Sequence, residues 1–197
     1  MPLDPELQEF TTGGQTQTVL TYTDRIRGEG VVEFFGYRTS ADDILTTVPV
    51  PSEGVGTWIA SMGVAPDVLQ LDLDFDVLVA TPMDIQGKFT ANVPFSLKAG
   101  GGGQINRGYV KVYLRTWDGS SEVTIASATG TTHENTVNDG ATWRHFVSNT
   151  QFDITNNTHL EPGIFLRITV EFYGGSTVVG KPGILFHDPK DRKGDDI

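Results

Sequence analysis

Hydrophobic and polar residues alternate through two long segments of the chain. Residues 109–117 place Val110, Val112 and Leu114 on one face and charged or aromatic side chains on the other. Residues 164–173 alternate in the same way, with an inward row of Ile164, Leu166, Ile168, Val170 and Phe172. Because a period of two is typical of strands that bury one face, both segments are predicted to be β-strands.

Clusters of glycine, proline, asparagine and aspartate divide the rest of the chain into further short runs. The clearest turn is Asp118-Gly119, which separates 109–117 from a run at 122–127 and predicts a tight hairpin. Other expected strands are Val19–Ile26, Val31–Arg38, Trp58–Met62, Leu69–Ala80, Lys88–Leu97, Trp143–Asn149, Phe152–Ile154 and Gly183–His187. The segment Ser40–Leu45 is expected to form one helical turn, because serine is a favourable helix-capping residue.

The amino-acid inventory also favours strands over helices. Valine, threonine and isoleucine together account for 54 residues, against nine alanines and six lysines. About eight to ten short strands without a long helical period predict an all-β fold, a single antiparallel β-sandwich. A chain of 197 residues is expected to form one domain around one core.

The two ends of the chain differ in composition from the sandwich, which is expected to span residues 19–187. Residues 1–18 end in a Thr/Gln/Gly stretch without apolar side chains and are expected to form an extended N-terminal arm. Residues 188–197 carry mixed charges and are expected to form a short exposed tail.

Charge and residue types exclude several classes of function. The formal net charge is −11, with 14 Lys and Arg against 25 Asp and Glu, so the basic footprint of a nucleic-acid binder is missing. No apolar stretch reaches the roughly 18 residues of a membrane span. The absence of cysteine excludes disulfides, thiolate nucleophiles and cysteine-bound metals. Neither a nucleic acid nor a membrane is therefore expected as a partner.

Three aspartates, Asp72, Asp74 and Asp76, alternate with apolar residues. Side chains two apart on a strand lie roughly 6.5–7 Å apart at Cα, close enough for two carboxylates to share a Ca²⁺ ion. The simpler interpretation is that the apolar residues face the core while the aspartates face water and protect a sheet edge. We expect no metal site, and both interpretations of the row stay open.

No residue pattern predicts a catalytic centre or a cofactor site, so the chain is not expected to be an enzyme. The four histidines have no partner at a metal-ligand spacing and are expected to be surface or hydrogen-bonded residues. They are His133, His145, His159 and His187. A β-sandwich glycosidase would need two carboxyls about 5–9 Å apart. Glu33, Glu122 and Glu171 fall on separate expected strands, where outward positions are routinely charged.

Tyr109, Tyr113 and Trp117 share the outward side of one expected strand, interleaved with Lys111 and Arg115. Large aromatic side chains on an exposed patch are typical of an interface, so these three are predicted to bind a partner. The alternative is that a second sheet or a neighbouring loop covers them. The arm adds three apolar candidates for partner binding, Leu3, Leu7 and Phe10.

Four parts of the chain resemble jelly-roll auxiliary proteins on the virions of tailed bacterial and archaeal viruses, the decoration or cement proteins. They are residues 28–37, residues 71–75 with 85–94, residues 109–126, and residues 164–173 with 186–189. The resemblance implies a jelly-roll sandwich, a homotrimer, a location in the virion and attachment to the major capsid protein or to neighbouring virion subunits. It implies no catalytic residue.

Two other functions stay open at this stage. A jelly roll is also compatible with the receptor- or carbohydrate-binding module of a tail fibre, which aromatic side chains on an exposed loop end would favour. A secreted sandwich glycosidase would instead require two carboxyls that converge in a cleft.

Overall fold

The structure is a computed structural model. It describes residues 32–38, 43–47, 67–100 and 105–176, together with the backbones of strands at 9–12, 15–18, 57–62 and 181–185. Every regular element within these residues is a β-strand. In this part of the chain, no helix is long and apolar enough to cross a membrane.

The described strands are short at the start of the chain, and later in the chain long strands occur together with shorter ones. The short strands are β1 (Glu9–Thr12), β2 (Gln15–Thr18), β3 (Phe35–Arg38) and β4 (Asp43–Thr46). They are followed by β5 (Thr57–Met62), β6 (Val68–Leu78), β7 (Met83–Lys98), β8 (Asn106–Trp117), β9 (Glu122–Thr129), β10 (His133–Asn135), β11 (Trp143–Leu160), β12 (Phe165–Ser176) and β13 (Lys181–Leu185). Most of the expected strands that fall within the described residues are thus confirmed, with β7 longer than predicted, whereas residues 32–34 of the expected strand at 31–38 lie outside β3.

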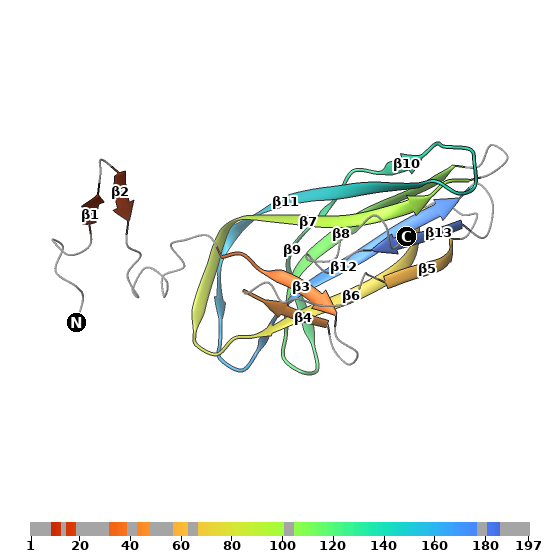
Figure 1. Ribbon diagram of the computed structural model, residues 1–197. Helices are drawn as coiled ribbons and strands as arrows, with labels where there is room; N and C mark the ends of the chain where they lie inside the picture. The colour runs from red at the N-terminus through yellow and green to blue at the C-terminus, as the bar shows by residue number, and fades with distance from the viewer. Residues whose placement is uncertain are drawn as a thin grey trace.

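Two large sheets face each other in a sandwich (Figure 1). The seven-stranded sheet has the order β10-β8-β12-β6-β4-β3, and β9 also pairs with β8. The four-stranded sheet has the order β11-β7-β13-β5. Among the described strands, β4 and β6 pair in parallel, through Ile44 and Asp76, while the other pairings are antiparallel.

Strands from the two halves of the sandwich pair in a nested order. β5 pairs with β13, β6 with β12, β7 with β11, and β8 with β9. The first and third pairs belong to the four-stranded sheet, and the second and fourth belong to the seven-stranded sheet. The region from β5 to β13 is therefore one long antiparallel ribbon of paired strands, folded across both sheets.

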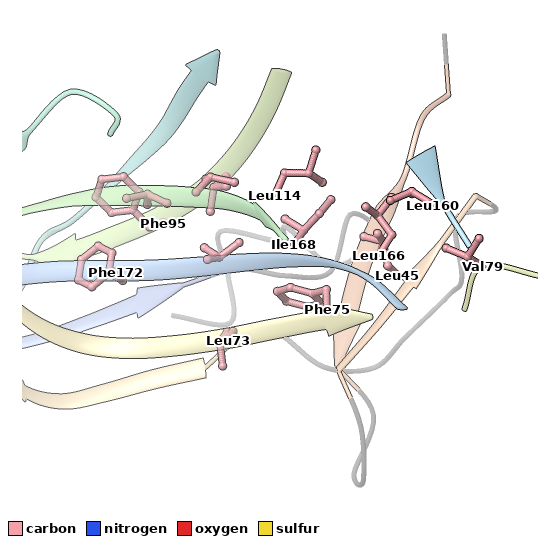
Figure 2. Close-up of a cluster of buried hydrophobic side chains, with 14 of the residues drawn as sticks. Leu45, Leu73, Phe75, Val79, Phe95, Leu114, Leu160, Leu166, Ile168 and Phe172 are labelled. Atoms are coloured by element: carbon pink, nitrogen blue, oxygen red, sulfur yellow. The ribbon is translucent and has the colours of Figure 1, made fainter. Parts of the chain in front are cut away.

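The inward rows of both sheets meet in one hydrophobic core (Figure 2). Phe95 of β7 and Phe172 of β12 are fully buried and contact each other edge to face, with ring centroids 5.3 Å apart. The predicted inward rows are confirmed, since Val110 and Val112 of β8 are fully buried and Leu166 of β12 is buried. The core fixes which side chains of each sheet point outward.

Three expectations about individual elements are wrong. The runs at 143–149 and 152–154 form the single strand β11, because the inward residues Ser148 and Thr150 are buried polar side chains that interrupt the apolar pattern without ending the strand. Residues 43–46 form β4 instead of a helical turn, because pairing with β3 and β6 satisfies their backbone groups. The aspartate row protects no sheet edge, because β6 lies between β12 and β4.

Part of the predicted N-terminal arm is a hairpin and not an extended segment. β1 and β2 pair antiparallel with Thr12 opposite Gln15, and the two residues between them in the sequence are glycines, a pair typical of tight hairpins. Residues 40–42, the expected strand at 19–26 and the tail at 188–197 lie outside the described residues, as do Leu3 and Leu7 and the side chain of Phe10.

Candidate functional site

The face of the seven-stranded sheet that points away from the core carries a group of charged and aromatic side chains on β6, β12 and β8. Antiparallel pairing sets these side chains in five rows across the three strands. The rows are Leu78–Phe165–Trp117, Asp76–Arg167–Arg115, Asp74–Thr169–Tyr113, Asp72–Glu171–Lys111 and Leu69–Tyr173–Tyr109. We call this surface the outer face.

Arg167 lies at the centre of the charged rows. Its Nε and Nη2 donate to the two carboxylate oxygens of Asp76 at 2.7 Å each, and its Nη1 donates to Asp74 at 3.1 Å. The guanidinium also lies over the ring of Trp117, 4.8 Å from the centroid, within the range of a cation–π contact. The hydrogen bonds to Asp76 are the main reason that the pKa of Arg167 is raised.

Glu122 of β9 joins the two guanidiniums of the outer face. Arg115 and Arg167 stand directly opposite each other on β8 and β12, where like charges repel. The Glu122 carboxylate accepts one hydrogen bond from Arg115 at 3.0 Å and another from Arg167. It therefore offsets the repulsion and ties the β8–β9 hairpin to β12.

The β6 side of the outer face is acidic. Burial, and then the neighbouring carboxylates of Asp74 and Glu171, raise the pKa of Asp72 above its usual value. Glu171 is 8% exposed and accepts a hydrogen bond from the Tyr173 hydroxyl at 2.7 Å. That hydrogen bond, followed by burial, raises the pKa of Tyr173 to about 12. Within the described residues, no group of three potential ligands is placed to hold a metal ion.

The three aromatic residues of β8 that were predicted to bind a partner lie in three different rows of this face. Tyr109 stacks against Tyr173, with ring centroids 5.1 Å apart and planes within 4° of parallel. Tyr113 lies between two cations, 4.5 Å from Lys111 Nζ and 4.2 Å from the Arg115 guanidinium. Each of the three is partly exposed, and these contacts come from side chains of the same sheet.

Apolar side chains close the outer face at both ends. Leu78 is 54% exposed beside Phe165 in the first row. Leu69 is 45% exposed beside Tyr173 in the last row, and Val68 next to it is also exposed. The face thus has a charged centre between two rows of apolar and aromatic side chains.

Two of the three glutamates considered for a glycosidase, Glu122 and Glu171, are engaged in other contacts. Glu122 is bound by two arginines, and Glu171 is buried against the Tyr173 hydroxyl. Glu33 is an exposed residue ahead of β3. The contacts of Glu122 and Glu171 are those of structural carboxylates, so the geometry gives no support to a catalytic pair built from them.

The described histidines each have a structural partner. His159 Nδ1 lies 2.6 Å from Asp84, and this hydrogen bond raises the pKa of His159 and lowers that of Asp84. His145 Nδ1 lies 2.6 Å from the Ser96 hydroxyl. His133 packs against the rings of Phe95 and Phe146. His187 lies outside the described residues.

Sequence reasoning identified the β8 residues of the outer face but missed their partners on β12. Arg167, Thr169, Glu171 and Tyr173 alternate with the predicted inward row of 164–173, so their outward direction was readable. Their neighbours were not, because Arg167 meets Asp76 across 91 positions of the chain and no local signal sets that register.

The fold and this surface together define a β-sandwich protein with an ordered charged and aromatic face on its larger sheet. No protein-family model matches the chain, and no curated protein matches it. Among solved structures, the chain is similar to one in the structure of infectious bursal disease virus Gx strain, with a TM-score of 0.29, 11% identity, and coverage of 71% of this chain and 37% of that one. The corresponding values for the Gt strain are 0.25, 11%, 73% and 38%. The chain thus spans less than two fifths of the length of either, and we draw no function from the likeness.

Proposed function

We propose that the chain is a structural protein of a virion, which decorates or cements a capsid through protein–protein contacts, and that its sandwich is a jelly roll. The single observation that carries the proposal is the nested pairing of β5 with β13, β6 with β12, β7 with β11 and β8 with β9. A jelly roll is a two-sheet sandwich of eight such strands, and viral capsid domains are among its main users.

One fold hosts many functions, so the proposed role within the virion also rests on the surface of the protein and on the sequence resemblance. Four parts of the sequence resemble decoration and cement proteins, and three of them contribute strands β6, β8 and β12 of the outer face. A cementing subunit has to bind a neighbouring protein over a broad, flat area. The outer face offers aromatic and apolar rows around ion pairs that are already formed, for contact with a neighbouring subunit, which includes another copy of this chain.

Mass spectrometry of particles purified from the source culture tests the virion role. We expect peptides of this chain in gradient-purified particles, in a constant ratio to the main shell protein across the particle peak. A chain that is found only in the soluble fraction would overturn the proposal. Binding of the recombinant protein to emptied particles, followed by electron microscopy, would then locate it on the shell.

Two more specific expectations, a homotrimer and glycan binding, stay predictions that the recombinant protein tests. The homotrimer implied by the resemblance predicts a threefold mass in sedimentation equilibrium. The glycan-binding alternative rests on the partly exposed residues Tyr109 and Tyr173, whose rings stack on each other. It predicts saturable binding on a glycan array that is lost in Tyr109→Ala.

A further inference from the structure

We infer that the outer face is a contact between two copies of this chain, which pack face to face about a two-fold axis parallel to β12. The observation behind this inference is the sorting of charge by strand. β6 presents Asp72, Asp74 and Asp76, whereas β8 presents Lys111 and Arg115, on the other side of β12. The inference goes beyond the virion role and does not depend on it.

Rotation about such an axis brings β6 of one copy over β8 of the other. Each of the five rows then lies opposite the same row of the second copy. Asp72 then faces Lys111 of the second copy, and Asp76 faces Arg115. The symmetry repeats both contacts, as in any isologous interface. A two-fold axis across the strands would instead place the aspartates of β6 against one another, an arrangement that like-charge repulsion disfavours.

The uncharged rows match under the same rotation. Leu78 at one end comes to lie over Trp117 of the second copy, and Leu69 at the other end comes to lie over Tyr109. In the middle row the Tyr113 hydroxyl faces Asp74, a carboxylate able to accept its hydrogen bond. All five rows therefore meet a complementary partner, and both exposed leucines are covered.

Residues of β12 lie on the axis, so each of them faces the same residue of the second copy. The two charged residues among them are set low in the sheet: the Arg167 side chain is 12% exposed and Glu171 is 8% exposed. Arg167 is also neutralised by Asp74, Asp76 and Glu122. Phe165, which is partly exposed, gives the axis an apolar contact.

The outer face is ordered before it meets a partner, which lowers the cost of association. Arg167, Arg115 and Tyr173 are already fixed by hydrogen bonds within the chain. Long side chains that are immobilised in advance lose less rotamer entropy on binding. A rigid face with matching rows favours a second copy of the same face over a partner that must adapt to it.

The salt dependence of binding distinguishes a second copy of this chain from a basic protein as the partner of the outer face. Each chain carries a formal net charge of −11, so two copies repel at long range at low ionic strength. At about 150 mM salt the Debye length falls to about 8 Å, which screens this repulsion more than it screens contacts inside a desolvated interface. Dimerisation should therefore strengthen as salt rises from about 10 to about 150 mM, whereas binding to a basic protein should weaken.

Charge reversal with mixing tests the contact in the full-length chain. Sedimentation velocity at about 150 mM salt, over roughly 10–500 µM protein, should show a reversible monomer–dimer equilibrium and not the trimer that the sequence resemblance implies. We expect Asp72→Lys and Lys111→Glu each to weaken dimerisation by at least about tenfold, and an equimolar mixture of the two to restore it, because both cross-contacts regain opposite charges. The matched control, Asp153→Lys, changes an exposed aspartate on β11 of the other sheet and should dimerise like the wild type.

A cross-linking measurement does not depend on the charge variants. The chain has no cysteine, so Phe165→Cys introduces a single thiol next to the proposed axis. Packed sheets lie about 10 Å apart, too far for a disulfide, so a bis-maleimide of about 8 Å should link two copies through this residue. Val147→Cys, on the other sheet, should give little product. A monomeric wild type at every concentration, an unaffected Asp72→Lys variant, a mixture that fails to restore the dimer, or equal cross-linking at both positions would each overturn the inference.

Discussion

Arg167 is the residue on which the outer face depends, since three carboxylates from β6 and β9 converge on its guanidinium. We expect Arg167→Met to lower the free energy of unfolding by about 2–3 kcal/mol, because it leaves those carboxylates to repel one another in a partly buried setting. Arg167→Lys should lose about 1 kcal/mol, since an ammonium cannot make the two-pronged contact with Asp76. Urea unfolding measures both changes. Equal losses in the two variants would mean that a positive charge without the guanidinium geometry stabilises nothing, whereas an Arg167→Lys variant as stable as the wild type would mean that charge alone holds the network.

Gly108 illustrates how the core constrains a single backbone position. A Cβ at this position would lie 2.5 Å from Cζ of Phe172, whose ring is fully buried and has no room to swing aside. We expect Gly108→Ala to destabilise the fold by about 1–3 kcal/mol through overpacking. In a Phe172→Leu background the same change should cost much less, and a double-mutant cycle measures the coupling. Additive effects of the two substitutions would contradict this explanation.

His159 gives the fold a small dependence on pH. Its hydrogen bond to Asp84 raises the pKa of His159, so the stabilisation is fully present below the unfolded value of 6.5 and is lost as pH rises through the raised value. The lowered pKa of Asp84 sets the acid limit of this stabilisation. The contribution of the Asp84 carboxylate to stability is fully present above pH 3.8 and is lost as pH falls through the lowered pKa. His159→Gln should therefore lower the melting temperature most near about pH 5.5 and least above about pH 8.5. A loss of the same size at both pH values would exclude the protonated histidine as its cause.

At the scale of elements, the β8–β9 hairpin is closed by its turn chemistry. Gly119 has a φ of +94°, and the Asp118 carboxylate accepts hydrogen bonds from the backbone N–H groups of Ser120 and Ser121 at 2.8 and 2.7 Å. We expect Gly119→Ala to destabilise the protein by about 1–2 kcal/mol, because a residue with a Cβ is strained at positive φ. Ser120→Ala, which keeps the backbone donor, is the matched control and should cost less in the same thermal melts. A larger loss in the control would shift the importance of the turn from backbone conformation to the serine hydroxyl.

The strands could be predicted where one face is apolar throughout, and not where polar residues are buried. The inward rows of β8 and β12 were readable because every second residue is aliphatic or aromatic. β11 was divided in two because Ser148 and Thr150 occupy inward positions. β4 was mistaken for a helical turn because the capping signal at Ser40 is local, while its pairing with β6 joins residues more than thirty positions apart. The pairing of Arg167 with the aspartate row was out of reach for the same reason, since long-range register has no signature in one sequence.

At the scale of the whole molecule, we propose two separate surfaces for contact with other proteins, the outer face and the N-terminal segment. The outer face belongs to the sandwich, and the ordering of its side chains depends on the core beneath them. β1 and β2, by contrast, form a two-stranded sheet of their own among the described strands. An isolated hairpin is marginally stable in water, so this segment is expected to contribute little to the stability of the sandwich.

Deletion of residues 1–18 tests whether the segment contributes to attachment and not to the stability of the sandwich. We expect the truncated chain to melt within a few degrees of the full chain, because the core is built from residues of β4 and later strands. Attachment to a capsid or to a neighbouring subunit should weaken, since burial of Leu3, Leu7 and Phe10 on a partner would contribute on the order of 1.5–3 kcal/mol each, less the entropy of ordering the segment.

A triple change of these residues to serine in the full-length chain is the matched variant, because it keeps the chain length and removes only the apolar side chains. Thermal melts follow the first expectation and a pelleting assay with purified shells follows the second. Unchanged pelleting of both variants would remove the segment from the attachment mechanism, whereas a large fall in melting temperature would assign residues 1–18 to the folded domain.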